Sequence, residues 1–136
     1  MNSAAINAFC TTFLGPPPVR RLVYGINAYA EHLARLVTVD GFIDDFTEHH
    51  HWLGKPVLRL AEVPTDSWVV SCVTVQPKTA LRRLAAHGIH HYLDYYAMAQ
   101  LQPALLPQVN AVAATQKDHA LHPEKYAWVR SLLKEP

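Results

Sequence analysis

Short apolar runs alternate with amphipathic stretches along this chain, a pattern that predicts strands separated by helices. Five runs suit strands, and the fourth is so continuously apolar that it is typical of a strand covered on both faces. The third is short and begins with proline, which favours an edge position. In chain order, the five runs are residues 19–24, 39–43, 56–58, 68–73 and 89–93.

Helical periodicity fills the intervals between the longer strands. One helix follows the first strand, with Ala30, Leu33 and Val37 at helical spacing. Another opens at Gln76 and is ended by Gly88, with its apolar side chains inward and its cationic side chains, Lys78, Arg82 and Arg83, outward. We therefore expect an α/β fold with a Rossmann-like open parallel sheet, ordered 3-2-1-4-5 and flanked by helices.

Both ends of the chain are expected to be helical. Residues 1–18 predict an amphipathic helix that buries Ile6, Phe9 and Phe13, followed by a proline-rich joint. We expect residues 19–94 to form the Rossmann-like, nucleotide-binding-type domain. Residues 95–136 predict a helical C-terminal tail whose last apolar residues, Trp128 among them, spread too widely for one stripe. We expect this tail to pack on the domain or on a partner, either another domain or a second copy.

Composition narrows the classes of partner and location. Twelve basic and eleven acidic residues give a formal net charge of +1 without a Lys/Arg tract, which argues against a nucleic-acid partner. No run approaches the roughly 20 apolar residues of a membrane span, and the first residues lack a basic leader. Cys10 and Cys72 lie far apart, and Cys72 falls in an apolar run, which favours free thiols. We expect a cytoplasmic protein that does not bind membranes.

The turn after the first strand offers the clearest chemistry. In a dinucleotide fingerprint G-x-G-x-x-G, backbone N–H groups at the start of a helix bind phosphate. The three glycine positions hold Gly25, Asn27 and Ala30, and Ile26 lies within the turn. Asn27 puts a side chain where phosphate would approach, but its amide can donate to a single phosphate or to the diphosphate of a nucleotide sugar. The alternative is a turn that binds nothing.

Polar residues follow the second and fourth predicted strands. Asp44 ends the second strand, where an acid can accept hydrogen bonds from ribose hydroxyls. Asp45 either contacts the ribose as well or braces the following loop. Both could instead satisfy backbone N–H groups of a turn. Thr74, Gln76 and Lys78 follow the fourth strand at the same edge of the sheet, where Lys78 could meet phosphate or remain solvated.

These segments together resemble the N-terminal Rossmann-like helper domain of FkbM-type methyltransferases and, more distantly, the N-terminal domain of bacterial nucleotide-sugar acetyltransferases. In the acetyltransferases the matching turn and acid line a nucleotide-sugar site, which implies such a role for Gly25, Asn27 and Asp44. In the FkbM-type proteins the module precedes an S-adenosylmethionine-dependent methyltransferase domain, and no second glycine-rich strand and turn here supplies one. The resemblance spans residues 19–133 and is carried by residues 25–30, 41–45, 52–58, 69–70, 84–89 and 93–96.

Nine histidines raise the possibility of a metal, because Glu48-His49-His50-His51 combines imidazoles with a carboxylate. Consecutive residues point in different directions, so we expect an exposed loop near the nucleotide site and no metal centre. No nucleophile elbow, Walker loop, paired-cysteine motif or Ser/His/Asp order is present. We assign no catalytic residue, and whether the chain belongs to an enzyme is left open.

Two hypotheses follow. The first is a non-catalytic helper module that binds a nucleotide or a nucleotide sugar. The second is an interaction or dimerisation domain with a vestigial nucleotide pocket, whose C-terminal helices dock a partner. A small NAD-dependent oxidoreductase is disfavoured, because no proton-donor arrangement accompanies the altered turn.

Overall fold

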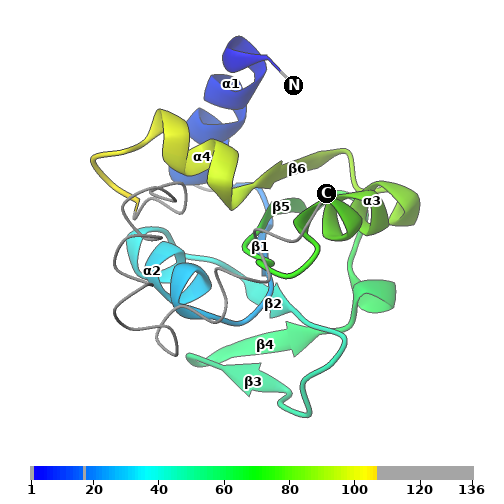
Figure 1. Cartoon of the computed structure of the whole chain (residues 1–136). Helices are drawn as coiled ribbons and strands as arrows, with labels where there is room; N and C mark the ends of the chain where they lie inside the picture. The colour runs from blue at the N-terminus through cyan, green and yellow to red at the C-terminus, as the bar shows by residue number, and fades with distance from the viewer. Residues whose placement is uncertain (1, 17, 107–136) are drawn as a thin grey trace, which may run out of the picture.

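The computed structural model describes residues 2–16 and 18–106, and in this part of the chain four helices surround one six-stranded sheet (Figure 1). The α/β prediction is confirmed. The helices are α1 Ser3–Leu14, α2 Ala28–Leu36, α3 Pro77–His87 and α4 Tyr95–Leu101, with a 3-10 turn η1 at Leu60–Glu62. The strands are β1 Arg21–Tyr24, β2 Gly41–Ile43, β3 His51–Trp52, β4 Lys55–Leu58, β5 Trp68–Ser71 and β6 His91–Asp94.

The sheet order is β3-β4-β2-β1-β5-β6, which differs from the predicted order 3-2-1-4-5 by one additional strand, β3. The five predicted strands correspond to β4, β2, β1, β5 and β6 and keep their predicted relative order. All neighbouring strands pair in parallel except β3 and β4, which form an antiparallel hairpin. The prediction missed β3 because it treated residues 45–54 as a polar loop, and it therefore placed residues 56–58 at the edge of the sheet. The additional strand β3 occupies the edge instead. The rings of Trp52 in β3 and Phe42 in β2 pack edge to face, with 4.7 Å between their centroids.

The residues of β1 alternate between two hydrophobic cores, one on each face of the sheet. Val23 joins the core beneath α1, α2 and α4, whereas Leu22 and Tyr24 join the core beneath α3 and η1. Val70 and Val69 of β5 divide in the same way. Covering both faces removes the alternation of polar and apolar residues, which explains the continuous apolar runs in the sequence.

Helix α1 packs into the first of these cores, as its periodicity predicts. Phe9, Cys10 and Phe13 are buried, and the partly buried Ile6 packs against the same core. Arg21 of β1 is only 3% exposed, and its guanidinium donates to the carbonyl oxygens of Thr12, Phe13 and Gly15. Carbonyl groups at the end of a helix lack the N–H partners of a further turn, although Thr12 also accepts the Gly15 N–H here, and a cation is favoured at a helix C-terminus. The buried arginine therefore fastens α1 to the central strand.

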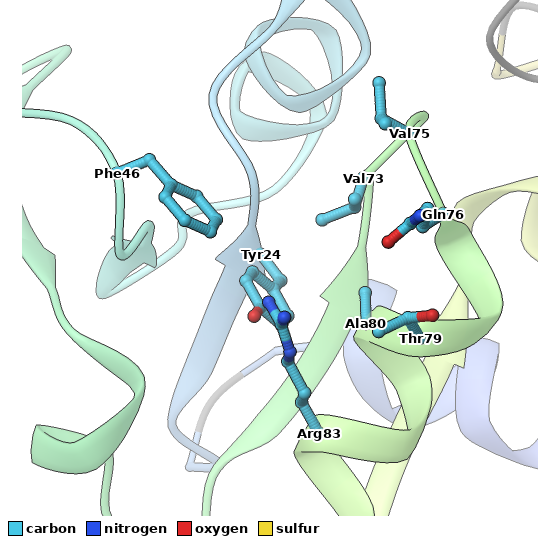
Figure 2. Close-up of a pocket in the computed structure, with 8 residues that line it drawn as sticks. All are labelled: Tyr24, Phe46, Val73, Val75, Gln76, Thr79, Ala80 and Arg83. Atoms are coloured by element: carbon cyan, nitrogen blue, oxygen red, sulfur yellow. The ribbon is translucent and has the colours of Figure 1, made fainter.

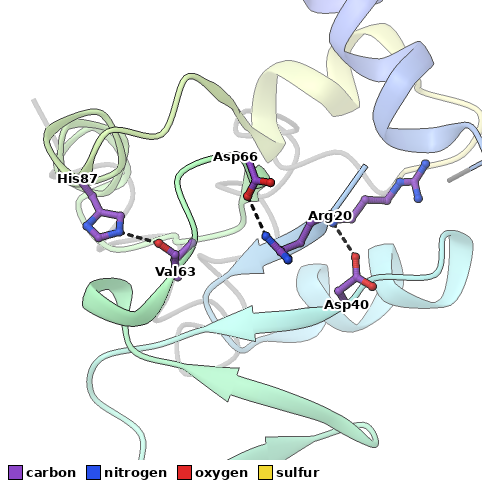
Figure 3. A network of polar contacts seen from close by, with 6 residues as sticks. Arg20, Asp40, Val63, Asp66 and His87 are labelled. Carbon is purple, nitrogen blue, oxygen red and sulfur yellow. Dashed lines mark hydrogen bonds and ion pairs between the residues drawn. The ribbon is translucent and has the colours of Figure 1, made fainter. Parts of the chain in front are cut away.

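Polar contacts at the amino ends of the strands connect the loops on that side (Figure 3). Arg20 pairs with Asp66 at 2.7 Å, and Asp40 accepts from the backbone N–H of Arg21 at 2.8 Å. His87, the last residue of α3, hydrogen-bonds the carbonyl of Val63 at 2.8 Å. The loops that carry the candidate site lie at the opposite edge of the sheet, at the carboxyl ends of the strands.

Helix α3 ends at Gly88, as predicted. Gly88 has φ of 97°, and its N–H donates to the carbonyl of Ala85 while Ile89 N–H donates to that of Leu84. This pair of bonds is a Schellman motif, which favours glycine at the left-handed position. The predicted C-terminal tail is described only through α4 and Leu106, so residues 107–136, including Trp128, lie outside the described residues. Among the helices described, none has the length and apolar character needed to cross a bilayer.

Candidate functional site

The candidate site lies at the carboxyl ends of the parallel strands, where open α/β sheets bind ligands. The loops after β1, β2 and β5 meet at this edge. One cavity of about 220 Å³ lies between Tyr24 and α3. A second, of about 310 Å³, lies at the start of α2 and is lined by Asn27, Ala28, Tyr29 and Thr74.

Gly25 shapes the turn after β1. Its φ is 100°, and a Cβ atom there would lie 3.3 Å from Val73 Cγ2 and 3.4 Å from the Val73 nitrogen. The Gly25 N–H donates to the carbonyl of Ile43 at 2.8 Å. Glycine is therefore required by the left-handed backbone and by the close approach of the loop after β5.

Asn27 caps α2 and joins two loops. Its Oδ1 accepts the N–H of Ala30 at 3.0 Å, and its Nδ2 donates to the carbonyl of Cys72 at 2.7 Å. Both polar ends of the side chain are thus engaged inside the protein. Neighbouring Ile26 is partly buried and packs against the core under α2. The chain thus passes from strand to turn to helix as the sequence predicts. The Asn27 side chain links this turn to α2 and to the end of β5.

The two aspartates after β2 organise their own loops. Asp44 Oδ1 accepts the N–H groups of Phe46 and Thr47 at 2.8 and 2.9 Å, an Asx-type turn. Asp45 Oδ1 accepts the N–H of Leu60 at 2.9 Å. These contacts fit the turn-bracing interpretation of both residues. They engage one oxygen of each carboxylate.

The cavity beside α3 brings together residues that, apart from Gln76, sequence reasoning did not select. Figure 2 shows Tyr24 at the end of β1, Phe46 across from it, and Arg83 reaching from α3 toward Tyr24. The other lining residues are Val73, Val75, Gln76, Thr79 and Ala80. Arg83, expected on the outward face of α3, is exposed but lines this cavity. Lys78 is exposed and lines neither cavity.

Opposite charges act on the Tyr24 hydroxyl. Burial raises its pKa above the ordinary value, the guanidinium of Arg83 lowers it, and the carboxylates of Asp45 and Asp44 raise it. Burial has the largest effect, so the hydroxyl stays protonated at neutral pH and can donate a hydrogen bond. The cavity therefore has acidic groups toward the β2 loop and a cation toward α3.

The rim of this cavity combines apolar exposure with an unfavourable backbone conformation. The side chains of Phe46 and Val75 are 84% and 58% exposed. Gln76, which precedes α3, has φ of 54°, a left-handed conformation that is uncommon for a residue with a Cβ atom. Backbone strain of this kind concentrates at binding and catalytic sites.

A third carboxyl group at this edge, beside those of Asp44 and Asp45, was not identified in the sequence as a candidate ligand. Asp94 ends β6, where burial raises its pKa to about 6 and a backbone hydrogen bond from Tyr96 acts in the opposite direction. Burial also raises the pKa of the Cys72 thiol well above its ordinary value, and the charge of Asp94 adds to this effect. Cys72 is thus a protonated, buried thiol rather than a nucleophile.

The histidine tract lies beside the hairpin. His49 and His50 are exposed in the loop, and His51 begins β3. Within residues 2–16 and 18–106, no group of three or more His, Cys, Asp or Glu side chains is placed to hold a metal ion.

Comparisons of the chain with protein-family models, curated proteins and solved structures found no match. The candidate site therefore rests on its geometry and chemistry. The resemblance to FkbM-type helper domains stays a prediction.

Proposed function

We propose that this chain is a non-catalytic module with a Rossmann-like fold that binds a nucleotide or a nucleotide sugar, and that it is related to the helper domain of FkbM-type methyltransferases. The observation that carries the proposal is the cavity at the carboxyl edge, where Tyr24, Phe46 and Arg83 converge from three different elements. Ligands of open α/β sheets bind at this edge.

The chemistry of the cavity matches the three parts of a nucleotide. An exposed aromatic ring, Phe46, offers a surface on which a base can stack. Asp44 and Asp45 do not line the cavity, but their charges act on Tyr24 from the loop after β2. Each keeps a carboxylate oxygen beyond its loop contacts, which is an acceptor for a ribose hydroxyl. Arg83 supplies a cation for phosphate. Asn27 and Thr74 line the neighbouring cavity at the start of α2. Gly25 and Ile26 form the turn that leads to it, and Lys78, in the first turn of α3, is exposed outside both cavities.

The alternative function is an interaction or dimerisation domain with a vestigial pocket. The contacts of Asn27 favour it, because the side chain that would meet phosphate is bonded to Ala30 and Cys72. The exposure of Phe46 and Val75 is compatible with both functions, since an apolar rim can contact either a ligand or a protein.

Thermal unfolding with UDP-, CMP- and GDP-sugars tests the proposal. A ligand present at 100 times its dissociation constant stabilises the folded state by about 2.7 kcal/mol. We expect one nucleotide sugar to raise the unfolding temperature, and Phe46→Ala to reduce that shift. Leu36→Ala is a matched control, because Leu36 is also exposed but lies at the end of α2, outside both cavities.

No shift with any nucleotide sugar, together with a concentration-dependent change in oligomeric state, would favour the interaction domain. An equal loss of the shift in both variants would remove Phe46 from the site without removing the binding function.

A further inference from the structure

We infer that the phosphate of the ligand binds to Arg83 on the α3 side of the sheet, in the cavity beside Tyr24, rather than at the N-terminus of α2. The inference deepens the proposed function and rests on it in taking the ligand to carry phosphate. It also reverses the expectation drawn from the turn at Gly25, which places phosphate on the other side of the loop after β5.

The α2 end of the site offers phosphate little. The Ala30 N–H already donates to the Asn27 side chain, and the Gly25 N–H donates to the Ile43 carbonyl. The side-chain NH2 group of Asn27 donates to the carbonyl of Cys72. An anion bound by any of these three groups would displace a hydrogen bond that holds the turn or joins it to a neighbouring strand end, and breaking such a bond costs free energy.

Arg83, in contrast, has an available charge. In the part of the chain that the structure describes, the ion pairs join Arg20 to Asp66 and Arg35 to Glu31, so Arg83 has no carboxylate partner there. Figure 2 shows its guanidinium directed into the cavity beside the Tyr24 ring. A guanidinium binds phosphate through two parallel hydrogen bonds, an arrangement that lysine cannot make.

Neutral donors surround this cation. The Tyr24 hydroxyl, the Gln76 amide and the Thr79 hydroxyl all belong to residues that line the cavity. Thr79 accepts a hydrogen bond from Arg82 at 3.0 Å, which leaves its own hydroxyl proton for a ligand. Arg83 thus lies among groups that can share the oxygens of one phosphate.

The charge distribution sets the orientation of the ligand. Asp44 and Asp45 act on Tyr24 from the loop after β2, whereas Arg83 acts on it from α3. Phosphate is repelled by the two carboxylates and attracted by the guanidinium, while sugar hydroxyls can donate to the carboxylates. A sugar phosphate fits this polarity, with its phosphate toward α3 and its hydroxyls toward the β2 loop.

The volume of the cavity agrees with this placement. At about 220 Å³ it is smaller than the roughly 300–1,000 Å³ typical of pockets that enclose a drug-sized ligand. It can hold the phosphorylated sugar, with the base outside at the rim. Phe46, 84% exposed, is available there.

Calorimetric titration with UDP, uridine and pyrophosphate tests the inference in the intact chain and in Arg83→Gln and Arg35→Gln. Both arginines are exposed helix residues, so the variants change net charge equally, but Arg35 lies on α2 and lines neither cavity. We expect Arg83→Gln to weaken UDP binding about 10- to 100-fold, as for loss of a charged hydrogen bond. Arg35→Gln removes only an exposed ion pair with Glu31 and should change UDP affinity less than about threefold. Arg83→Lys should restore only part of the affinity.

The outcomes separate this inference from the proposed function. Tight UDP binding that Arg83→Gln leaves unchanged would overturn the inference and preserve the function. Binding of pyrophosphate that depends on Arg83, without binding of UDP, would preserve the phosphate site and overturn the nucleotide function. Absence of binding by all three probes would overturn both. Circular dichroism and unfolding temperatures of the variants confirm that each one folds.

Discussion

Asp94 carries a carboxyl group into the protein at the end of β6, and its charge costs stability. Burial raises its pKa from the ordinary value of 3.8 to about 6 in the folded protein. This difference in pKa corresponds to a loss of about 3 kcal/mol in the free energy of unfolding when the carboxyl group is charged. A raised pKa means that the folded state binds the proton more tightly than the unfolded state. Stability is therefore greatest below about pH 4 for this group and falls as pH rises to about 6.

We predict that Asp94→Asn increases the free energy of unfolding at pH 7 by about 1–3 kcal/mol, because the amide removes the buried charge and keeps the side-chain shape. The variant should also lose the fall in stability between pH 4 and 6. Urea unfolding across this pH range measures both effects. Asp66→Asn is the control, because its exposed ion pair with Arg20 is worth less than about 1 kcal/mol. A variant no more stable than the parent at pH 7 would contradict the prediction.

At the scale of elements, the β3–β4 hairpin depends on an unfavourable turn. Leu53 and Gly54 both have positive φ, 53° and 75°, as a two-residue type I′ turn requires. Glycine and asparagine adopt this conformation readily, whereas leucine does so at a cost of about 1 kcal/mol. Leu53 is nearly half exposed, so its side chain contributes little burial to compensate.

Leu53→Asn should therefore stabilise the protein by about 1 kcal/mol in urea unfolding. Gly54→Ala provides the opposite test, since an added Cβ would meet no atom within 4 Å, and only the backbone conformation opposes it. We expect that variant to lose about 1 kcal/mol. A destabilising Leu53→Asn would show that the contacts of the leucine side chain outweigh its backbone strain.

The same turn explains the strand that sequence reasoning missed. Leu-Gly lacks the Asn-Gly or Asp-Gly signal of a short hairpin, and a two-residue strand is too short to show alternation. The end of α3 was predictable because Gly88 carries a local signal for termination. Local chemistry thus predicts element boundaries where glycine, proline or asparagine has a conformational reason to be there, and fails where leucine occupies a glycine-like position.

At the scale of the whole molecule, the sequence predicts which edge of the sheet carries the candidate site. It predicts only some of the residues that line the site. Gly25, Asn27 and Asp44 lie at strand ends, so their positions follow from the order of the elements. Tyr24 and Arg83 converge only because β1 lies beside β5 and α3 packs over both. Arg83 follows Thr79 by one helical turn, which places both on the face beside Ala80, but that spacing alone does not distinguish a cavity from solvent.

The central claim is that a phosphorylated ligand binds in the cavity between Tyr24 and α3. Backbone and arginine side-chain NMR spectra recorded during a UDP titration test it most directly, because they locate binding residue by residue. We predict saturable shifts at Tyr24, Phe46, Thr79 and Arg83, with Arg20 and the other residues at the amino ends of the strands unchanged. Shifts confined to the amino ends, or no saturable shift anywhere in the spectrum, would contradict the account.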